Sequence, residues 1–89
     1  MTKHYPFLKF YTKESCHLCD IAFKIVTQVS KKIKFDIETV DITQSDYLMM
    51  KYGIEIPVIE IDGNFAFKHK INEKDLLRSI KKYSAEYVS

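Results

Sequence analysis

The 89-residue sequence has little glycine, proline or cysteine, with two residues of each, and it has no tryptophan. So little glycine and proline excludes collagen-like and low-complexity chains, and 46% hydrophobic residues are typical of a globular domain. Fourteen lysines and arginines oppose twelve aspartates and glutamates, so the formal net charge is only +2. Because no basic stripe stands out either, we expect no nucleic-acid partner.

Long apolar runs are also missing. The start, MTKHYPFLKFYTK, has no apolar stretch of signal-peptide length, and no segment approaches the roughly 20 apolar residues of a membrane span. We therefore expect a cytoplasmic protein without a membrane partner. The length predicts one domain, residues 1–89, whose active site sits on the fold itself rather than on a long insertion.

The first half of the chain alternates between strand and helix patterns. Residues 7–12 are a short, nearly continuous apolar run, typical of a buried central strand. Apolar residues then recur at helical spacing over residues 18–33, and Ser15 or Cys16 is the natural cap of this helix. Residues 34–42 return to strand character.

The second half predicts a short helix, a hairpin and a last helix. Thr43 is the expected cap of the short helix and Gly53 its left-handed stop. Asp62-Gly63 is the pair that a tight hairpin turn prefers, and Asn72 begins the last helix. Strands joined by a helical crossover are parallel and a hairpin is antiparallel. The order β-α-β-α-β-β-α therefore predicts an α/β fold with a mixed four-stranded sheet and helices on both faces.

The stretch YTKESCHLCD places the two cysteines, Cys16 and Cys19, where a strand gives way to a helix. In a reducing compartment such a pair indicates redox catalysis or metal binding rather than a structural framework. The positive end of the helix dipole stabilises a thiolate, and at such positions the pKa of a cysteine falls from ~8.5 to roughly 3.5–7.5. We predict Cys16 as the nucleophile and Cys19, one turn further in, as the resolving thiol.

Two neighbours of the cysteines are candidate substrate-binding residues. Lys13 can place a cation beside Cys16 or beside an anionic substrate, and His17 can add charge or donate a hydrogen bond. A solvated surface side chain is the alternative reading of each. Further along, Lys68, His69 and Lys70 form a small basic cluster, which is either a solvated strand end or a site for an anionic part of a substrate.

The alternative function is that of a non-enzymatic module in which the cysteine pair binds zinc or an iron-sulfur cluster. Tetrahedral zinc needs two further ligands, and the histidines His4, His17 and His69 are the only candidates with nitrogen donors. A two-iron cluster could be shared between two chains. We expect no metal site within one chain.

Two segments of the sequence resemble glutaredoxins. YTKESCHLCD is similar to their Tyr-Ser-Lys-x-x-Cys-Pro-Tyr-Cys motif, and YGIEIPVIEIDG is similar to their Tyr-Gly segment with a Val-Pro pair and a later glycine. The resemblance covers most of the chain and implies a thioredoxin fold and a thiol-disulfide oxidoreductase acting in cell redox homeostasis. It also implies that Pro57 is a cis-proline opposite the active site and that Ile56 and Val58 offer backbone groups to a peptide-like substrate.

The resemblance implies glutathione as a co-substrate, with no bound cofactor. Two departures from the family's pattern bear on it: His17-Leu18 replaces Pro-Tyr between the cysteines, and KHKINEKD replaces the Gly-Gly before the last helix. Those glycines permit close approach of the backbone to a ligand. We therefore predict poor use of glutathione by a monomeric enzyme whose partner is a disulfide-bearing protein or small molecule.

Overall fold

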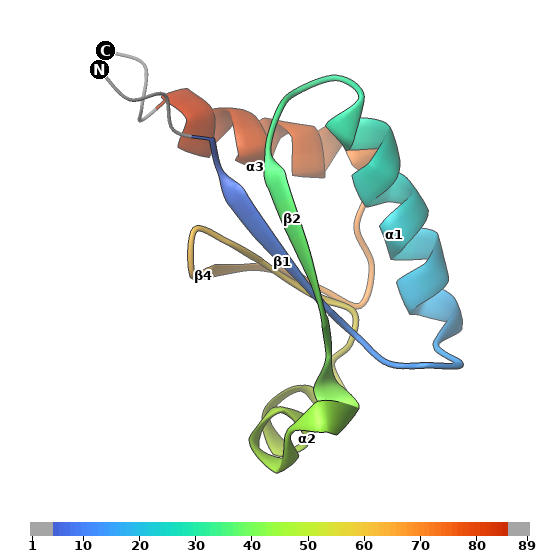
Figure 1. Cartoon of the computed structure of the whole chain (residues 1–89). Coiled ribbons are helices and arrows are strands. Elements are labelled where there is room, and N and C mark those ends of the chain that lie inside the picture. Colours follow the sequence, from blue (N-terminus) through green and yellow to red (C-terminus); the bar gives the residue numbers. More distant parts are fainter. Residues whose placement is uncertain (1–4, 86–89) are drawn as a thin grey trace.

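A computed structural model describes residues 5–85 of the chain. Its strands form one mixed sheet in the order β2-β1-β3-β4, in which β1 runs parallel to β2 and antiparallel to β3 (Figure 1). This confirms the predicted α/β architecture. The elements are β1 (Phe7–Thr12), α1 (His17–Ser30), β2 (Asp36–Asp41), the 3-10 turn η1 (Ile42–Gln44), α2 (Asp46–Tyr52), β3 (Val58–Ile61), β4 (Asn64–Lys68) and α3 (Glu73–Ala85).

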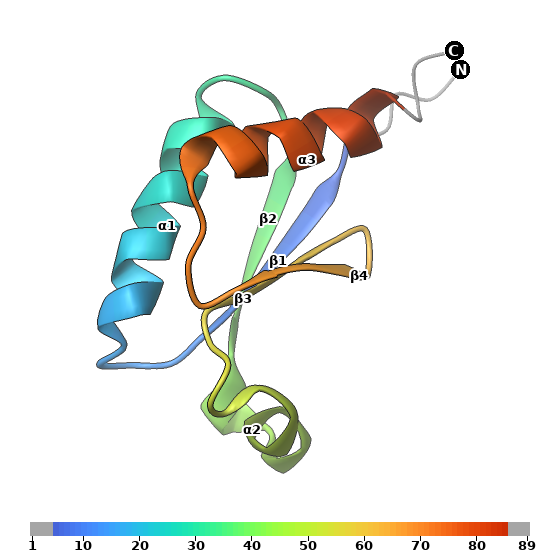
Figure 2. The ribbon, with the colours of Figure 1, turned by 180° about the vertical axis from the view of Figure 1, so that it is seen from behind.

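Helices cover the sheet unequally. Neighbouring residues of a strand point to opposite faces, and in β1 the Phe10 ring meets Phe23 of α1 whereas the Tyr11 ring meets Tyr52 of α2. Helices α1 and α3 lie together over the first face, and the short α2 lies at one end of the second (Figures 1 and 2). None of the helices within residues 5–85 is long and apolar enough to cross a membrane.

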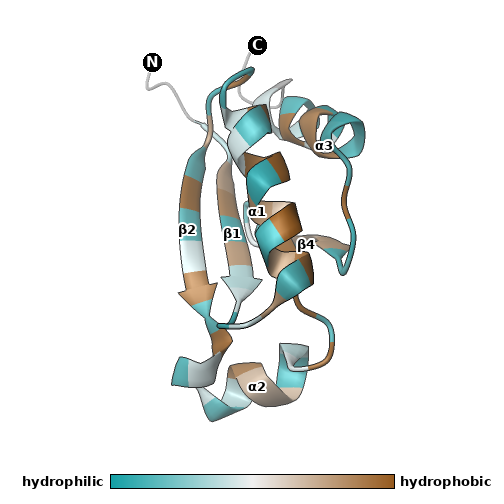
Figure 3. Ribbon diagram, turned by 90° about the vertical axis from the view of Figure 1, so that its right-hand side faces the viewer, coloured by the Kyte–Doolittle hydropathy of each residue, from teal (hydrophilic) through white to brown (hydrophobic). Residues whose placement is uncertain are grey.

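Most of the hydrophobic core fills the layer between the sheet and the two long helices, and a smaller part lies on the opposite face, under α2. Along α1, hydrophobic and hydrophilic bands alternate, as expected for a helix with one buried flank (Figure 3). The side chains with at most 1% of their surface exposed include Leu8, Val26, Val29, Ile42, Val58, Ile59, Ile61, Leu76 and Ile80. This core holds the start of α1 against the ends of the central strands.

Helix α2 differs from the prediction at both ends. Ser45, not Thr43, is its N-cap, because the Ser45 hydroxyl accepts a backbone N–H of the first turn at 3.2 Å. Thr43 lies in the preceding 3-10 turn, where the Asp41 carboxylate accepts its N–H and its hydroxyl. Gly53 is not left-handed: its φ is −51° and its N–H donates to the Met49 carbonyl. A Cβ at Gly53 would collide with that carbonyl oxygen.

The hairpin and the start of α3 are formed as predicted. Asp62 and Gly63 both have positive φ values, 51° and 83°, which the two central residues of a type I′ turn require. The Asn72 side chain accepts the Asp75 N–H at 2.8 Å and donates to the Asp75 carboxylate at 2.9 Å, so α3 begins with a closed pair of capping contacts. The turn lies just before β4 and the cap lies just before α3, so the two features bracket β4 and the segment that follows it.

A carboxylate on β3 joins α2 to the sheet. The hydroxyls of Tyr11 and Tyr52 donate to the two oxygens of Glu60, at 2.8 and 2.7 Å. Both tyrosines are buried. Burial and, after it, the Glu60 carboxylate raise the pKa of both hydroxyls above the ordinary value of 10.0.

We expect this cluster to weaken the fold in alkaline solution. Above the ordinary tyrosine pKa the unfolded chain loses these protons while the folded chain keeps them, so the free energy of unfolding falls as pH rises. Tyr52→Phe removes one such group, and its thermal midpoint should fall less steeply than that of the wild type between about pH 9 and 11. Tyr47→Phe, at a side chain that is 66% exposed, is the control. Parallel curves for Tyr52→Phe and the wild type would contradict the expectation.

Candidate redox site

The strand register brings the cysteine loop and the proline to the same end of the sheet. Tyr11, near the end of β1, pairs with Val58, the first residue of β3. Pro57 therefore lies opposite the end of β1, where the chain turns into the loop that leads to Cys16. The Ile56-Pro57 peptide bond is cis, as predicted, and the side chains of residues 56–58 are buried.

The backbone groups of residues 56–58 are mostly used within the fold. The Ile56 N–H donates to the Tyr52 carbonyl at 3.2 Å, and the Pro57 carbonyl accepts the His69 N–H at 2.8 Å. Val58 pairs with β1 on one side and with β4 on the other. Among residues 5–85 the Ile56 carbonyl oxygen has no hydrogen-bond partner. This oxygen is thus the backbone acceptor of the segment that the described part of the chain leaves unused.

The two cysteines occupy very different positions at the start of α1. Cys16 is the N-cap, with an extended backbone, and its Sγ accepts the Cys19 N–H at 3.1 Å. Of the two predicted caps, Ser15 and Cys16, the structure therefore has the second. Cys16 is partly exposed, whereas only 2% of Cys19 is exposed. A disulfide joins the pair, with 5.2 Å between the Cα atoms.

The electrostatics of the helix start favour negative charge on Cys16. The N-terminal N–H groups of a helix carry partial positive charge, and the Cys19 N–H already points at the Cys16 sulfur. When the disulfide is reduced, the same N–H can hydrogen-bond a thiolate, which stabilises the charged form. Cys19 sits one turn deeper, where burial disfavours a charged sulfur.

The structure places Lys13 and His17 on either side of Cys16 along the chain. Lys13 is half-buried in the loop, and His17, the first residue of α1, is exposed. In the described part of the chain neither side chain forms an ion pair or a side-chain hydrogen bond. Neither side chain is hydrogen-bonded to the Cys16 sulfur within residues 5–85.

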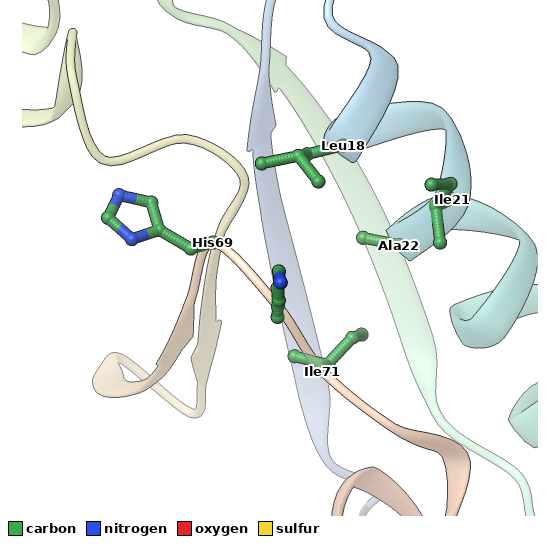
Figure 4. A pocket seen from close by; sticks show the side chains of 6 residues that line it. Leu18, Ile21, Ala22, His69 and Ile71 are labelled. Carbon is green, nitrogen blue, oxygen red and sulfur yellow. The ribbon is translucent and has the colours of Figure 1, made fainter.

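A pocket of about 180 Å³ lies beside the cysteine helix. Leu18, Ile21 and Ala22 line it from the first turns of α1, and Ile71 lines it from the segment between β4 and α3 (Figure 4). Lys70 and His69 complete the lining. The sequence patterns did not single this pocket out.

The structure divides the basic cluster that the sequence suggested. Lys68 pairs with Glu55, at 3.3 Å, and does not line the pocket, whereas His69 and Lys70 do. The His69 ring turns away from the apolar side chains (Figure 4), and its Nε2 lies 3.1 Å from the Ile54 carbonyl oxygen. The His69 backbone N–H also donates to the Pro57 carbonyl. His69 therefore contacts the segment that carries the proline at two points and stabilises its position.

Within residues 5–85 the cysteine pair has no cluster of further ligands that would complete a zinc site. Two thiolates supply half of a tetrahedral zinc set. No group of three or more His, Cys, Asp and Glu side chains that could hold a metal ion occurs among residues 5–85. The His69 ring is bound to a backbone carbonyl, and His4 lies outside the described residues.

A four-stranded sheet of this topology, with a Cys-x-x-Cys disulfide at the start of its first helix and a cis-proline facing that end, defines a thioredoxin fold whose cysteine pair fits a redox role. Comparison with known proteins then identifies the family. The model of the glutaredoxin-like domain (DUF836) matches residues 7–81, and the chain belongs to this family.

The relatives agree with this assignment. The chain is 31% identical over 75 residues to the glutaredoxin-like protein YDR286C homolog of Dictyostelium discoideum, a match that spans 78% of this chain and 69% of that protein. The X-ray structure of XcR50 from X. campestris superposes with a TM-score of 0.73 at 23% identity, covering 84% of this chain and 96% of that one. Thioredoxin 1 of Thermosipho africanus gives 0.66 at 15% identity, covering 90% and 96%. At such identities the two structures support the fold alone.

Proposed function

We propose that the protein is a thiol-disulfide oxidoreductase that reduces disulfides of proteins or small molecules, with Cys16 as nucleophile and Cys19 as resolving thiol. The asymmetry of the pair carries this proposal. Cys16 is partly exposed and its Sγ accepts a helix N–H at 3.1 Å, whereas Cys19 is almost fully buried. An exposed, stabilised thiolate suits attack on another molecule, and a buried thiol suits a second, internal attack.

The reaction starts from the reduced protein. The Cys16 thiolate attacks one sulfur of the substrate disulfide, so that a bond forms between these two sulfurs and the other substrate sulfur leaves as a thiolate and takes up a proton. Cys19, deprotonated, then attacks the Cys16 sulfur, and the substrate leaves as its second thiol. Two electrons pass to the substrate, and the protein ends as the Cys16–Cys19 disulfide. A thiol reductant restores the dithiol.

The other predicted site residues bind and orient the substrate in this scheme. The Ile56 carbonyl accepts a substrate N–H, while Pro57 and Val58 fix the position of that carbonyl at the sheet end. Lys13 and His17 supply positive charge or hydrogen-bond donors beside the mixed disulfide. The direct test is the reduction of insulin by the protein with dithiothreitol as the electron donor. A rate no higher than that of dithiothreitol alone would reject the proposal.

We also expect the two thiols of the reduced protein to alkylate very differently. Cys16 should react faster with iodoacetamide, and its rate should rise at a lower pH than that of a free cysteine, because the helix N-terminus stabilises its thiolate. Site-resolved mass spectrometry over a pH series measures both rates. The same protein in urea is the control, where the two rates should converge. A faster Cys19, or a free-thiol profile for Cys16, would reverse or remove the assigned roles.

A further inference from the structure

We propose that the pocket in Figure 4 binds one bulky apolar side chain of a substrate polypeptide, close to the substrate cysteine, and that Lys70 binds a carboxylate next to it. This rests on the proposed function and names its substrate class. The favoured substrate is then a polypeptide disulfide flanked by an apolar and an acidic residue.

The pocket borders both parts of the redox site. One wall begins at Leu18, which lies between the two cysteines in the sequence. The opposite wall is the segment after β4, and its first residue, His69, is bonded through its N–H to the Pro57 carbonyl. A polypeptide held on Cys16 and paired with the proline segment therefore has neighbouring side chains within reach of the pocket.

The volume of the pocket limits its occupant to a single side chain. Pockets for small-molecule ligands and cofactors usually have at least roughly 300 Å³. This pocket has about 180 Å³. A cavity of roughly 150 Å³ with an apolar lining admits a benzene molecule. A leucine, isoleucine or phenylalanine side chain is thus of suitable size, and a cofactor is not.

The lining favours an apolar occupant. Four of the six lining residues are apolar: Leu18, Ile21, Ala22 and Ile71. In the structure 39% of Leu18 and 43% of Ile21 are exposed, although both belong to the apolar side of α1. A substrate side chain that covers them removes apolar surface of both molecules from water, which is favourable.

The charge at the pocket favours an acidic neighbour. Lys32 and Lys68 are paired with carboxylates, but Lys70 forms no ion pair among the residues that the structure describes. A carboxylate of the substrate can therefore pair with Lys70 without displacing one of the protein's own. An exposed ion pair contributes little binding free energy. The Lys70 contact therefore favours one substrate over another but adds little to the overall affinity.

Peptide probes test both parts of the proposal. Each peptide has one cysteine, held as a mixed disulfide with thionitrobenzoate, which is coloured once it is released. Each peptide is named by a residue pair, and this pair is placed both before and after the cysteine. With reduced protein in excess, the Leu-Glu peptide should release the dye about tenfold faster than the Ser-Glu peptide, the lower end of what burial of a leucine provides. The Leu-Glu peptide should also react about two- to fivefold faster than the Leu-Lys peptide, which is the effect that the free energy of one exposed ion pair would produce.

Matched variants assign these preferences to the pocket. Ile21→Thr replaces an ethyl group by a hydroxyl within the lining, and Ile37→Thr makes the same change on β2 at a residue of similar exposure, 38%. Ile21→Thr should reduce the leucine preference to about threefold, whereas Ile37→Thr should keep it. Lys70→Glu should invert the preference between Leu-Glu and Leu-Lys, a change of sign that partial unfolding cannot produce.

Insulin reduction separates failure of the pocket from failure of the function. If insulin is reduced but all peptides react at equal rates, or if Lys70→Glu leaves their order unchanged, the pocket proposal is overturned and the oxidoreductase stands. If neither insulin nor any peptide is reduced faster than by Cys16→Ser, both proposals fall.

Discussion

Replacing Cys19 should turn the protein into a trap for its substrate, whereas replacing Cys16 should abolish reduction. Without Cys19 the mixed disulfide on Cys16 has no internal thiol to resolve it, so the substrate stays covalently bound. Without Cys16 the remaining thiol is buried, with 2% of its surface exposed, and cannot reach a substrate disulfide. The measurements are insulin reduction for both variants and mass spectrometry of the captured partner for the Cys19 variant.

The choice of variants follows from the positions of the two residues. Cys16→Ser keeps an N-cap, because serine caps helices well, so loss of activity there reports chemistry rather than folding. Cys19→Ser puts a hydroxyl into the core, which costs about 1–3 kcal/mol if the hydroxyl is left unpaired. Cys19→Ala avoids this cost and is the matched variant. Turnover by either Cys19 variant at the wild-type rate would show that an external thiol, not Cys19, resolves the mixed disulfide.

Glutathione should be a poor electron donor for this protein. Two contacts expected of a glutaredoxin, the tyrosine between the cysteines and the glycine pair before the last helix, are replaced here. Loss of two hydrogen-bonded contacts, at about 1–3 kcal/mol each, weakens binding by about 30-fold to 25,000-fold.

The structure adds a second reason for weak glutathione binding. At the start of α3 the Asn72 side chain and the Asp75 carboxylate cap the helix together, and Glu73 lies between them. A carboxylate of glutathione would meet an N-terminus where the Asp75 N–H is already bound to the Asn72 side chain, so fewer donors are free for it. The adjoining pocket is mainly apolar.

A coupled assay compares glutathione with dithiothreitol as donors at equal protein concentration. Dithiothreitol should reduce the Cys16–Cys19 disulfide rapidly. With glutathione as the donor, turnover of a small glutathione mixed disulfide should be slow. A dithiol glutaredoxin run in parallel is the control. Comparable glutathione turnover by the two proteins would mean that other residues of this chain replace the missing contacts.

The parts of the fold that sequence patterns predicted depend on short-range signals. The strand at residues 7–12, the cap at Cys16, the Asp62-Gly63 turn and the Asn72 cap are each determined within a few residues. The predicted N-cap of α2, Thr43, is wrong because Asp41 and Ser45, on either side of it, are competing hydrogen-bond acceptors for backbone N–H groups. Which acceptor caps the helix depends on the path by which β2 ends.

Sequence patterns predicted the cysteines, the proline and the basic residues His69 and Lys70 of the candidate site, but not the apolar part of the pocket. Leu18 and Ile21 look like core residues, since they belong to the apolar pattern of α1. The structure instead buries Cys19, Ala22, Val26 and Val29 and leaves Leu18 and Ile21 at the border of the core. What covers this border is a segment about fifty residues later in the chain, around Ile71, and helical spacing carries no information about that distance.

The place of β1 in the sheet has a consequence for the newly made chain. β1 is the first strand in the sequence and a central one in space, and it pairs with residues 58–61 of β3 as well as with β2. Closing so long a loop is slow and costs entropy, so the sheet cannot be completed until most of the chain has been synthesised. Until then the core cluster that contains Cys19 is incomplete, because it also includes Ile59 and Ile61 of β3. Both sulfurs are therefore open to oxidants and to other thiols during synthesis, and only the finished sheet makes one of them an outer and the other an inner thiol.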